Sequence, residues 1–206
     1  EDGYFDFYDQ LQKYRPQFAG EMKDAVIMWQ LLCHTSGIDD AEQEKYWREM
    51  LGEMPRDASG GHWINGEHSM TSTSAAGGLK STLDDMAKFG QMWLQMGTLN
   101  GNRIISPATV RMMTRDHNAK VPPSDWFGRV FGANWGLGWD LKCDKTDDHG
   151  FLRSPKSYNH GGYGGACLLL DPEQDLVFSG YFCEVAETSQ NDEFGPVFNI
   201  LYSAFD

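Results

Sequence analysis

The chain has 206 residues, 40% of them hydrophobic and 13% aromatic, and its 30 acidic against 17 basic side chains give a formal net charge of −13. This length suits a single domain with a buried core, while the negative charge argues against binding to nucleic acid or to an anionic membrane surface. No apolar stretch approaches the roughly 20 residues that a membrane-spanning helix needs, so we expect no membrane span.

The first third of the chain reads as short helices followed by loop. Aromatic and apolar side chains recur at helical spacing over residues 4–14, which predicts an amphipathic helix. A second short helix is expected over residues 26–32. An apolar stripe between residues 46 and 54 predicts a third helix, and the glycine, serine and threonine residues of 56–78 predict a loop.

The middle of the chain carries clear start and turn signals. Ser81 and Thr82 precede two aspartates, a capping pattern that predicts a helix over residues 83–96. The pair Asn100-Gly101 between apolar residues predicts a short hairpin. Ser106-Pro107 predicts the start of a further helix that ends near residue 114, and we expect residues 115–134 to form a loop.

The last third alternates in the manner of strands and then ends in a helix. Bulky side chains alternate with glycine or aspartate over residues 135–141, which predicts a strand with one bare face. After a polar loop, a glycine-rich stretch opens a second strand that ends before Asp171-Pro172, and a third strand follows from Leu176. Residues 194–205 have helical periodicity. The order predicts an α+β fold in which helices pack on an antiparallel sheet.

The four cysteines do not have the spacing of a metal or redox motif. They stand at positions 33, 143, 167 and 183, and none forms a C-x-x-C pair. Cys167 and Cys183 fall on predicted strands and read most simply as buried thiols. The sequence also leaves open a single disulfide between these two residues.

The glycine-rich stretch, residues 157–166, is the strongest candidate for a functional site. Four glycines accompany His160 within this stretch, and glycine in a strand often marks a place where a ligand or another backbone comes close. One interpretation is a strand edge whose backbone N–H groups face a substrate beside His160. The other is a glycine-rich hairpin with a surface histidine.

Four blocks of sequence resemble the serine β-lactamase-related family, which includes class C β-lactamases, penicillin-binding proteins and related esterases. Residues 31–37 resemble its "LLxHTSG" block, residues 77–89 its "GGLxSTxxDxAxF" helix start, and residues 103–107 its "xILSPxTV" block. Residues 160–165, with the hairpin after them, resemble its third active-site motif. The resemblance covers most of the chain outside about residues 38–76, and it implies a β-lactamase or penicillin-binding-protein fold.

The same resemblance implies an acyl-transfer site on the glycine-rich strand. Family members carry a nucleophilic serine and a lysine in Ser-x-x-Lys, a second motif Tyr-x-Asn or Ser-x-Asn, and a third motif Lys-Thr-Gly or His-x-Gly. His160 takes the first position of the third motif and would hold a substrate carboxylate or assist proton transfer. Gly161 and Gly162 would let an acyl substrate lie along the strand. The backbone N–H of Tyr163 would donate to the oxyanion, a bond whose loss costs about 3–4 kcal/mol of transition-state stabilisation.

Two departures from the family pattern lead us to expect an incomplete enzyme. No Ser-x-x-Lys occurs in the chain, and no Tyr-x-Asn occurs between Gly37 and Gly77. Ser157-Tyr158-Asn159 spells Ser-x-Asn, but it adjoins His160 on one strand, whereas the family places the second motif on a separate loop. We therefore expect residues 1–206 to form a single but partial domain, with the helical subdomain largely missing around 38–76.

Three functional hypotheses follow. The first is a truncated or inactive relative of a serine hydrolase that acts on esters, β-lactams or D-Ala-D-Ala peptides. The second is a non-catalytic module that binds a small acyl or peptide ligand. The third, a metal hydrolase using His62, His68, His149 and His160, lacks the usual ligand spacing. We expect neither a metal nor another cofactor. His34 and Ser36 are expected to end a helix and cap a turn, rather than to form a catalytic pair.

Overall fold

A computed structural model provides the structure, which describes residues 4, 6–20, 23–34, 36, 79–126, 129–146, 149–162, 165–181 and 194–205. The chain forms two compact units, one of residues 1–36 and 83–206 and the other of residues 37–82. All helices and strands below belong to the first unit. The predicted helix over 46–54, the loop over 56–78 and the expected loss of a subdomain around 38–76 lie outside the described residues, so the single-domain expectation stays a prediction.

The N-terminal segment contains short helical turns. They are the 3₁₀ helices η1 (Leu11–Lys13) and η2 (Lys23–Ala25) and the α-helix α1 (Met28–Leu32). The predicted helix over 4–14 is wrong within the described part. The Asp6 carboxylate accepts the backbone N–H of Tyr8, and the Asp9 carboxylate accepts that of Asp6. Local bonds of this kind compete with helix formation. The helix predicted over 26–32 is confirmed.

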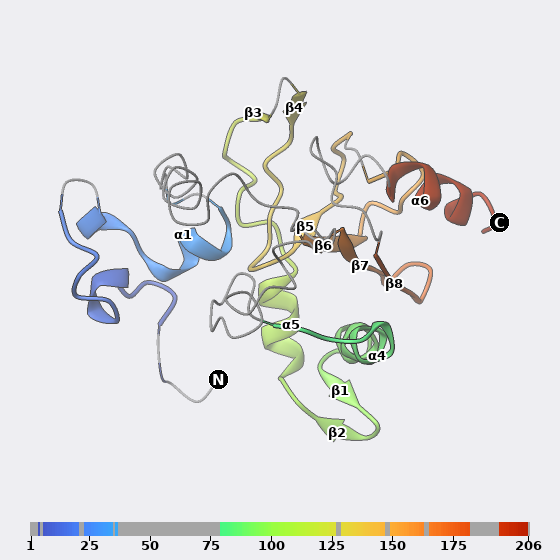
Figure 1. The fold of residues 1–206 in the computed structure, drawn as a ribbon, viewed down its shortest axis with the longest axis horizontal. Helices are drawn as coiled ribbons and strands as arrows, with labels where there is room; N and C mark the ends of the chain where they lie inside the picture. Colours follow the sequence, from blue (N-terminus) through green and yellow to red (C-terminus); the bar gives the residue numbers. More distant parts are fainter. Residues whose placement is uncertain are drawn as a thin grey trace, which may run out of the picture. The chain divides into compact units, whose positions relative to one another are not determined.

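A four-stranded antiparallel sheet forms the centre of the first unit (Figure 1). Its strands lie in the order β5 (Asp140–Leu141), β6 (Tyr158–Gly162), β7 (Ala166–Asp171) and β8 (Leu176–Tyr181). The pairs Asp140 with Asn159, and His160 with Leu168, fix the register on the two sides of β6. Strand β6 therefore has the long strand β7 on one side and the two-residue strand β5 on the other.

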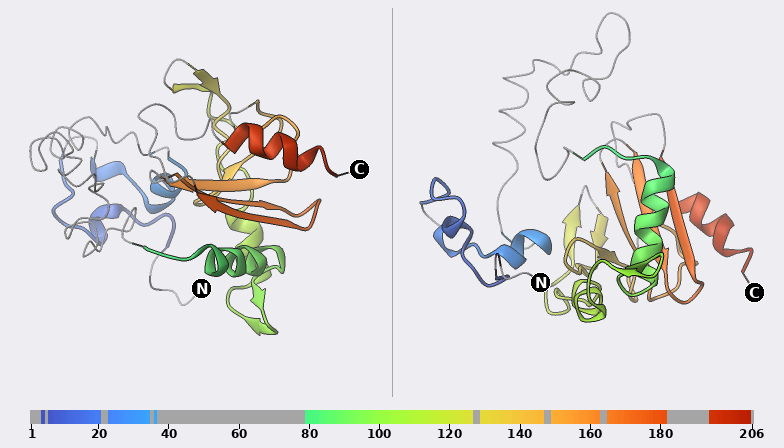
Figure 2. Two further views of the ribbon diagram at one scale, coloured as in Figure 1. Left: turned by 45° about the vertical axis from the view of Figure 1, so that its right-hand side comes forward. Right: turned by 90° about the horizontal axis from the view of Figure 1, so that it is seen from below.

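Strand β7 is buried on both faces, because helices cover both sides of the sheet (Figure 2). Cys167 and Leu169 pack with the C-terminal helix α6 (Phe194–Tyr202), whereas Leu168 and Leu170 pack with α4 (Leu83–Leu94) and its neighbours. This alternation is the two-residue period of a strand. It explains why residues 167–170 are a continuous apolar run, as strands covered on both faces are.

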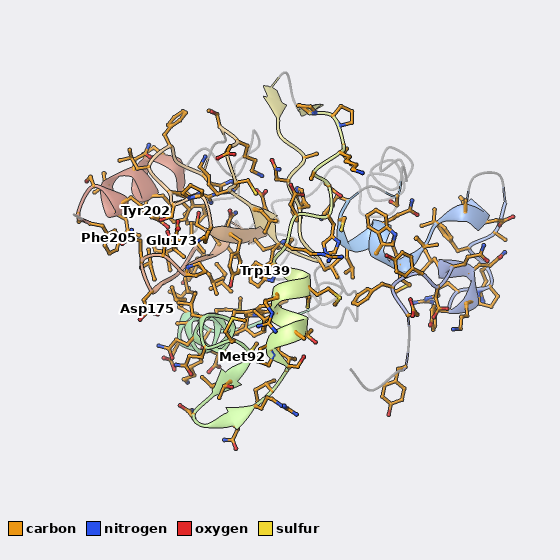
Figure 3. The ribbon with its side chains drawn as sticks, turned by 180° about the vertical axis from the view of Figure 1, so that it is seen from behind. Met92, Trp139, Glu173, Asp175, Tyr202 and Phe205 are labelled. Atoms are coloured by element: carbon orange, nitrogen blue, oxygen red, sulfur yellow. The ribbon has the colours of Figure 1, made fainter. Side chains whose placement is uncertain are left out.

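Helix α4 lies directly against the sheet. A Cβ atom added at Gly90 would come within 2.5 Å of Val177 Cγ1, so the glycine permits the close approach of α4 to β8. Met92 and Trp93 of the same helix are buried and pack with Trp139; Figure 3 shows Met92 on α4 and Trp139 near the sheet. Leu83, the first residue of the helix, is 45% exposed. The predicted helix is confirmed, and its buried residues lie in its second half.

The hairpin predicted at Asn100-Gly101 and the helix start predicted at Ser106-Pro107 are confirmed. Strands β1 (Thr98–Leu99) and β2 (Asn102–Arg103) form a hairpin through Asn100 and Gly101, which have φ values of 50° and 78°. Both values lie in the left-handed region, as a type I′ turn requires. Helix α5 (Pro107–Met113) begins after Ser106, whose hydroxyl accepts the N–H of Thr109 at 3.1 Å.

One loop prediction and two strand predictions are wrong in detail. Residues 115–134 contain a hairpin of β3 (Ser124–Trp126) and β4 (Arg129–Phe131), which Figure 1 shows extending away from the sheet. Residues 135–139 form a turn rather than a strand, because Trp135 bridges to Asp140 and Gly138 has a φ of 81°. The glycine-rich stretch does not open β7; it forms a separate strand, β6, and the turn after it.

The α+β fold with helices on an antiparallel sheet is confirmed. The two apolar clusters on opposite faces of the sheet account for most of the buried apolar side chains. Within the part of the chain that the structure describes, no helix is both long and apolar enough to cross a bilayer.

Candidate active site

The side of β6 away from β7 is covered only in part. Strand β5 pairs with Tyr158 and Asn159, and its register stops there. The backbone of Ser157 also bonds on this side, because its carbonyl accepts the N–H of Lys142 at 2.9 Å. Backbone groups of a strand point to alternate sides, so Gly161 presents its N–H and C=O on the same side as Ser157 and Asn159. No strand of the described sheet pairs with Gly161 there.

The two glycines of β6 leave this edge accessible. Gly162 is exposed and Gly161 partly exposed. A Cβ atom added at Gly162 would meet only the Cβ of Ala166, at 3.7 Å, which is ordinary contact. Packing among the described residues therefore gives no reason for glycine at this position. Tyr163, predicted to donate to an oxyanion, lies outside the described residues, and its role stays a prediction.

His160 stands at the start of this open edge with its side chain exposed. Neighbouring protein atoms nevertheless desolvate the ring enough to lower its pKa below 6.5, against the opposing effects of a bond to the Gly138 backbone and of the Asp140 charge. Desolvation disfavours the imidazolium form. The ring is thus biased toward the neutral form, which can accept a proton.

Two further aromatic rings lie in line with His160. The Trp135 ring meets that of His160 edge to face, with centroids 5.9 Å apart, and meets the ring of His34 at 4.4 Å. His34 follows α1 with a φ of 56°, the left-handed conformation typical of a residue that ends a helix. The expected structural role of His34 is confirmed, and the fold also brings it toward the candidate site.

Backbone bonds attach the end of α1 to the turn that carries Trp135. The N–H of Gly138 donates to the carbonyl of Leu32 at 3.0 Å, and the side chain of Asn118 donates to the carbonyl of Cys33 at 2.8 Å. Cys33 is fully buried and its thiol contacts the Gly136 carbonyl at 3.5 Å. The described start of the segment that resembles "LLxHTSG", residues 31–34, is therefore fixed beside the turn that carries Trp135.

A buried polar group supports β6 from within the unit. Arg153 is 4% exposed and its Nη1 donates to Oδ1 of Asn159 at 2.5 Å. Asp171, fully buried on the neighbouring strand, accepts the hydroxyl of Tyr202 at 2.6 Å. These bonds join the residue before His160 and the end of β7 to neighbouring segments, and so hold the sheet edge in place.

Charged side chains gather behind β5. Asp140 pairs with the ammonium of Lys145, and Nδ1 of His149 lies 3.8 Å from its other oxygen. All three side chains are largely buried. Nearby, a surface cavity of about 390 Å³ is lined by residues that include Asn134, Cys143 and Lys145, and His160 is not among them.

Only two of the four proposed metal ligands, His149 and His160, lie among the described residues. Within the described ranges, no group of three or more histidine, cysteine, aspartate or glutamate side chains has a geometry that could hold a metal ion. His149 pairs with Asp140, and His62 and His68 lie outside the described residues. Cys167 is a free thiol, and burial raises its pKa to about 12. Cys183, the other residue of the disulfide that the sequence left open, lies outside the described residues.

Comparison with known proteins agrees with this architecture. A family model described as Beta-lactamase matches residues 47–189. The chain belongs to the beta-lactamase family. Protein Rv1367c of Mycobacterium tuberculosis is 39% identical to this chain over 120 residues. The matched part covers 50% of this chain and 27% of Rv1367c. A Salmonella enteritidis protein described as "Putative D-alanyl-D-alanine carboxypeptidase" is 33% identical over 112 residues, 53% of the chain and 23% of the relative.

Solved structures of the beta-lactamase type share the fold. A structure described as "putative beta-lactamase from Bacteroides dorei" superposes with a TM-score of 0.59 at 20% identity, covering 97% of this chain and 78% of the other. A Bacillus anthracis protein described as "Putative 6-aminohexanoate-dimer hydrolase" gives a TM-score of 0.55 at 14% identity, covering 92% and 64%. The chain spans about a quarter of the length of the curated relatives it matches.

Proposed function

We propose that the open edge of β6 beside His160 binds the carbonyl group of an acyl substrate, as part of an acyl-transfer site of the serine hydrolase type. The observation that carries this proposal is that the register of β5 stops at Asn159, so that among the described strands none pairs with Gly161 on the side away from β7, next to an exposed imidazole. Membership of the beta-lactamase family supports the reaction class.

The roles follow from the geometry of the edge. Backbone N–H groups bind a developing oxyanion because they are fixed before the reaction and need no reorganisation. Gly161 and Gly162 admit the substrate to the strand, and the N–H of Tyr163 is assigned the oxyanion bond. His160, neutral near pH 7, accepts a hydrogen bond or a proton from the substrate. An ester, a β-lactam or a D-Ala-D-Ala peptide all suit this edge.

The chain itself supplies no nucleophile of the family pattern in this proposal, since no Ser-x-x-Lys occurs in its 206 residues. The same observation favours the second candidate function, a module that binds an acyl or peptide ligand without turnover. Covalent labelling with a fluorophosphonate probe or a fluorescent penicillin would distinguish a chain that carries an active serine from one that only binds the ligand. We expect no covalent labelling of the chain by either. Stoichiometric labelling at a single serine would contradict the absence of a nucleophile.

Binding itself is tested by titrating the 15N-labelled chain with N-acetyl-D-alanyl-D-alanine and with penicillin G. We expect the amide signals of Gly161 and Gly162 to shift in a saturable way. Gly162→Val, which fills the edge, and His160→Ala should each weaken binding by up to about tenfold, the effect of one lost hydrogen bond or more. Lys156→Ala, a change at a charged side chain that is 73% exposed, is the control. Unchanged affinity in both site variants would contradict the proposal.

A further inference from the structure

The indole of Trp135 lies outside the apolar core of the first unit. Trp93 and Trp139 are each 4% exposed and pack in the core cluster on the α4 side of the sheet. Trp135 is only partly buried and belongs to neither core cluster. Exposing a large apolar ring to water costs free energy. A ligand that covered the partly exposed ring of Trp135 would therefore gain binding free energy.

Its place is beside the open edge of β6. Trp135 forms an antiparallel bridge with Asp140, and Asp140 pairs with Asn159, the residue before His160. The order across the sheet is therefore Trp135, Asp140 and then β6. The indole lies between the exposed rings of His34 and His160, with centroid distances of 4.4 and 5.9 Å. Three segments remote in sequence thus present a continuous row of rings.

Hydrogen bonds hold the backbone that carries the indole and that of the two residues after it. The carbonyl of Trp135 accepts the N–H of His117 at 2.8 Å, and the N–H of Gly136 donates to Trp139 at 2.8 Å. Leu137 donates to the carbonyl of Met113, also at 2.8 Å. A ring held in this way needs little ordering when a ligand binds, which favours affinity.

We propose that Trp135 forms the apolar wall of the acyl site and selects acyl groups that carry a flat apolar ring near the carbonyl carbon. The proposal rests on the function proposed above. The carbonyl group lies along Gly161, and the ring of the acyl group packs on the indole between His34 and His160. Offset and edge-to-face contacts between rings add to the area buried, so an aryl-acyl ligand gains more here than an acetyl ligand does.

The test compares two uncharged probes, N-phenylacetylglycinamide and N-acetylglycinamide, by their dissociation constants for the chain. We expect the phenylacetyl probe to bind more tightly to the wild type. Trp135→Ala should lower the ratio of the two affinities about three- to tenfold, the range that ring contacts contribute. Trp135→Phe keeps a flat ring and should retain most of the preference. Phe151→Ala, at an aromatic side chain that is 69% exposed, should leave the ratio unchanged.

The ratio separates selectivity from folding, because a general loss of structure weakens both probes together. Equal affinities in the wild type, or an unchanged ratio in Trp135→Ala, would contradict the role of Trp135 while leaving acyl binding at β6 in place. If neither probe binds the wild type and the D-Ala-D-Ala and penicillin titrations also fail, the proposed function is wrong and this inference falls with it.

Discussion

The neighbours of His160 extend to lower pH the range over which its ring is neutral. An unperturbed histidine has a pKa near 6.5, and the protein atoms around this ring lower the pKa through desolvation despite the Asp140 charge. Trp135 contributes to that surrounding through its edge-to-face contact. The pKa of His160, the candidate acid-base group of the site, thus depends on Trp135, which lies 25 positions earlier in the chain.

An NMR titration measures this effect directly. We expect the ring protons of His160 to titrate with a midpoint below 6.5, and the midpoint to move up toward 6.5 in Trp135→Ala, where water gains access to the ring. Lys156→Ala, remote from the ring, is the control and should leave the midpoint unchanged. A wild-type midpoint at or above 6.5 would contradict the assigned desolvation.

The same pKa difference predicts a sign for the dependence of stability on pH. Below about pH 6.5 the unfolded chain protonates His160 before the folded chain does, so the unfolded state binds more protons and the free energy of unfolding falls as the pH falls. Above 6.5 both states are neutral at this residue and its contribution is constant. His160→Gln should therefore flatten the pH dependence between 6.5 and the folded pKa, measured by denaturant unfolding at several pH values. Equal slopes in wild type and variant would contradict it.

The sequence alone predicted His160 as a candidate site residue, but it did not predict that Trp135 and Arg153 lie beside the site. His160 and the glycines after it stand in a local pattern that can be read without a structure. Trp135 could have been noticed only as one bulky residue in an alternating run, and Arg153 as an ordinary residue of a polar loop. Their contacts with His160 and Asn159 arise from tertiary folding, which leaves no mark in local spacing.

The turn of residues 135–139 is the element that most affects the site. It was predicted as a strand because bulky residues alternate with Gly136 and Gly138, and a tight turn with glycines at alternate positions produces the same pattern. Close packing of another backbone segment accounts for the glycine at position 136. A Cβ atom there would lie 2.1 Å from the carbonyl oxygen of Met113.

Gly136→Ala should therefore destabilise the fold by about 1–3 kcal/mol, because backbone atoms on both sides must shift. The displaced turn should also move Trp135 and weaken the preference for the phenylacetyl probe. Gly162→Ala is a matched control, since the added Cβ meets only Ala166 at 3.7 Å, and it should change the free energy of unfolding little. Similar unfolding midpoints for the two variants would contradict the close packing at Gly136.

Helix α6 is attached to the sheet by a polar bond as well as by its apolar face. The hydroxyl of Tyr202 donates to Asp171, which is fully buried and also accepts the N–H of Glu173 at 2.8 Å. Burial raises the pKa of the Tyr202 hydroxyl, and the bond with Asp171 raises it further, so the phenol stays protonated. In Figure 3 Tyr202 lies beside Phe205 at the end of the chain.

Tyr202→Phe should cost about 1–3 kcal/mol in the free energy of unfolding, because a buried carboxylate loses a donor that water cannot replace. Tyr181→Phe, at a tyrosine that is 57% exposed, makes the same chemical change where water can compensate and should be nearly neutral. Denaturant unfolding of the two variants beside the wild type measures the difference. A neutral Tyr202→Phe would show that the bond does not hold α6.

Elements with strong local signals were predicted well, and those without them were not. The hairpin at Asn100-Gly101 and the helix after Ser106-Pro107 follow from turn and cap chemistry that acts within a few residues. The segment 4–14 has helical spacing, yet Asp6 and Asp9 accept nearby backbone N–H groups and Gln10 bridges to Ile27. Local polar bonds and a distant partner outweighed the apolar period there.

The whole first unit depends on one sheet whose two faces carry separate apolar clusters. Strand β7 contributes to both, with Leu168 toward α4 and Leu169 toward α6. A strand shared in this way couples the two clusters, because neither can lose its contacts without disturbing the backbone pairing on which the other depends. The continuous apolar run at 167–170 predicted a buried strand, but the sequence alone did not show which helix covers which face.

Leu168→Ala and Leu169→Ala should each lower the free energy of unfolding by about 2–5 kcal/mol, the cost of a cavity in a packed core. Both should shift the same transition, so that the near-UV signal of the tryptophans on the α4 side and the far-UV signal move together in either variant. Ile200→Ala, at a helix residue that is 73% exposed, should leave that transition in place. If Leu169→Ala loosened α6 in a first step while the tryptophan signal persisted to higher denaturant, the two faces would be independent units. The open edge of β6 would then depend on the α4 face alone.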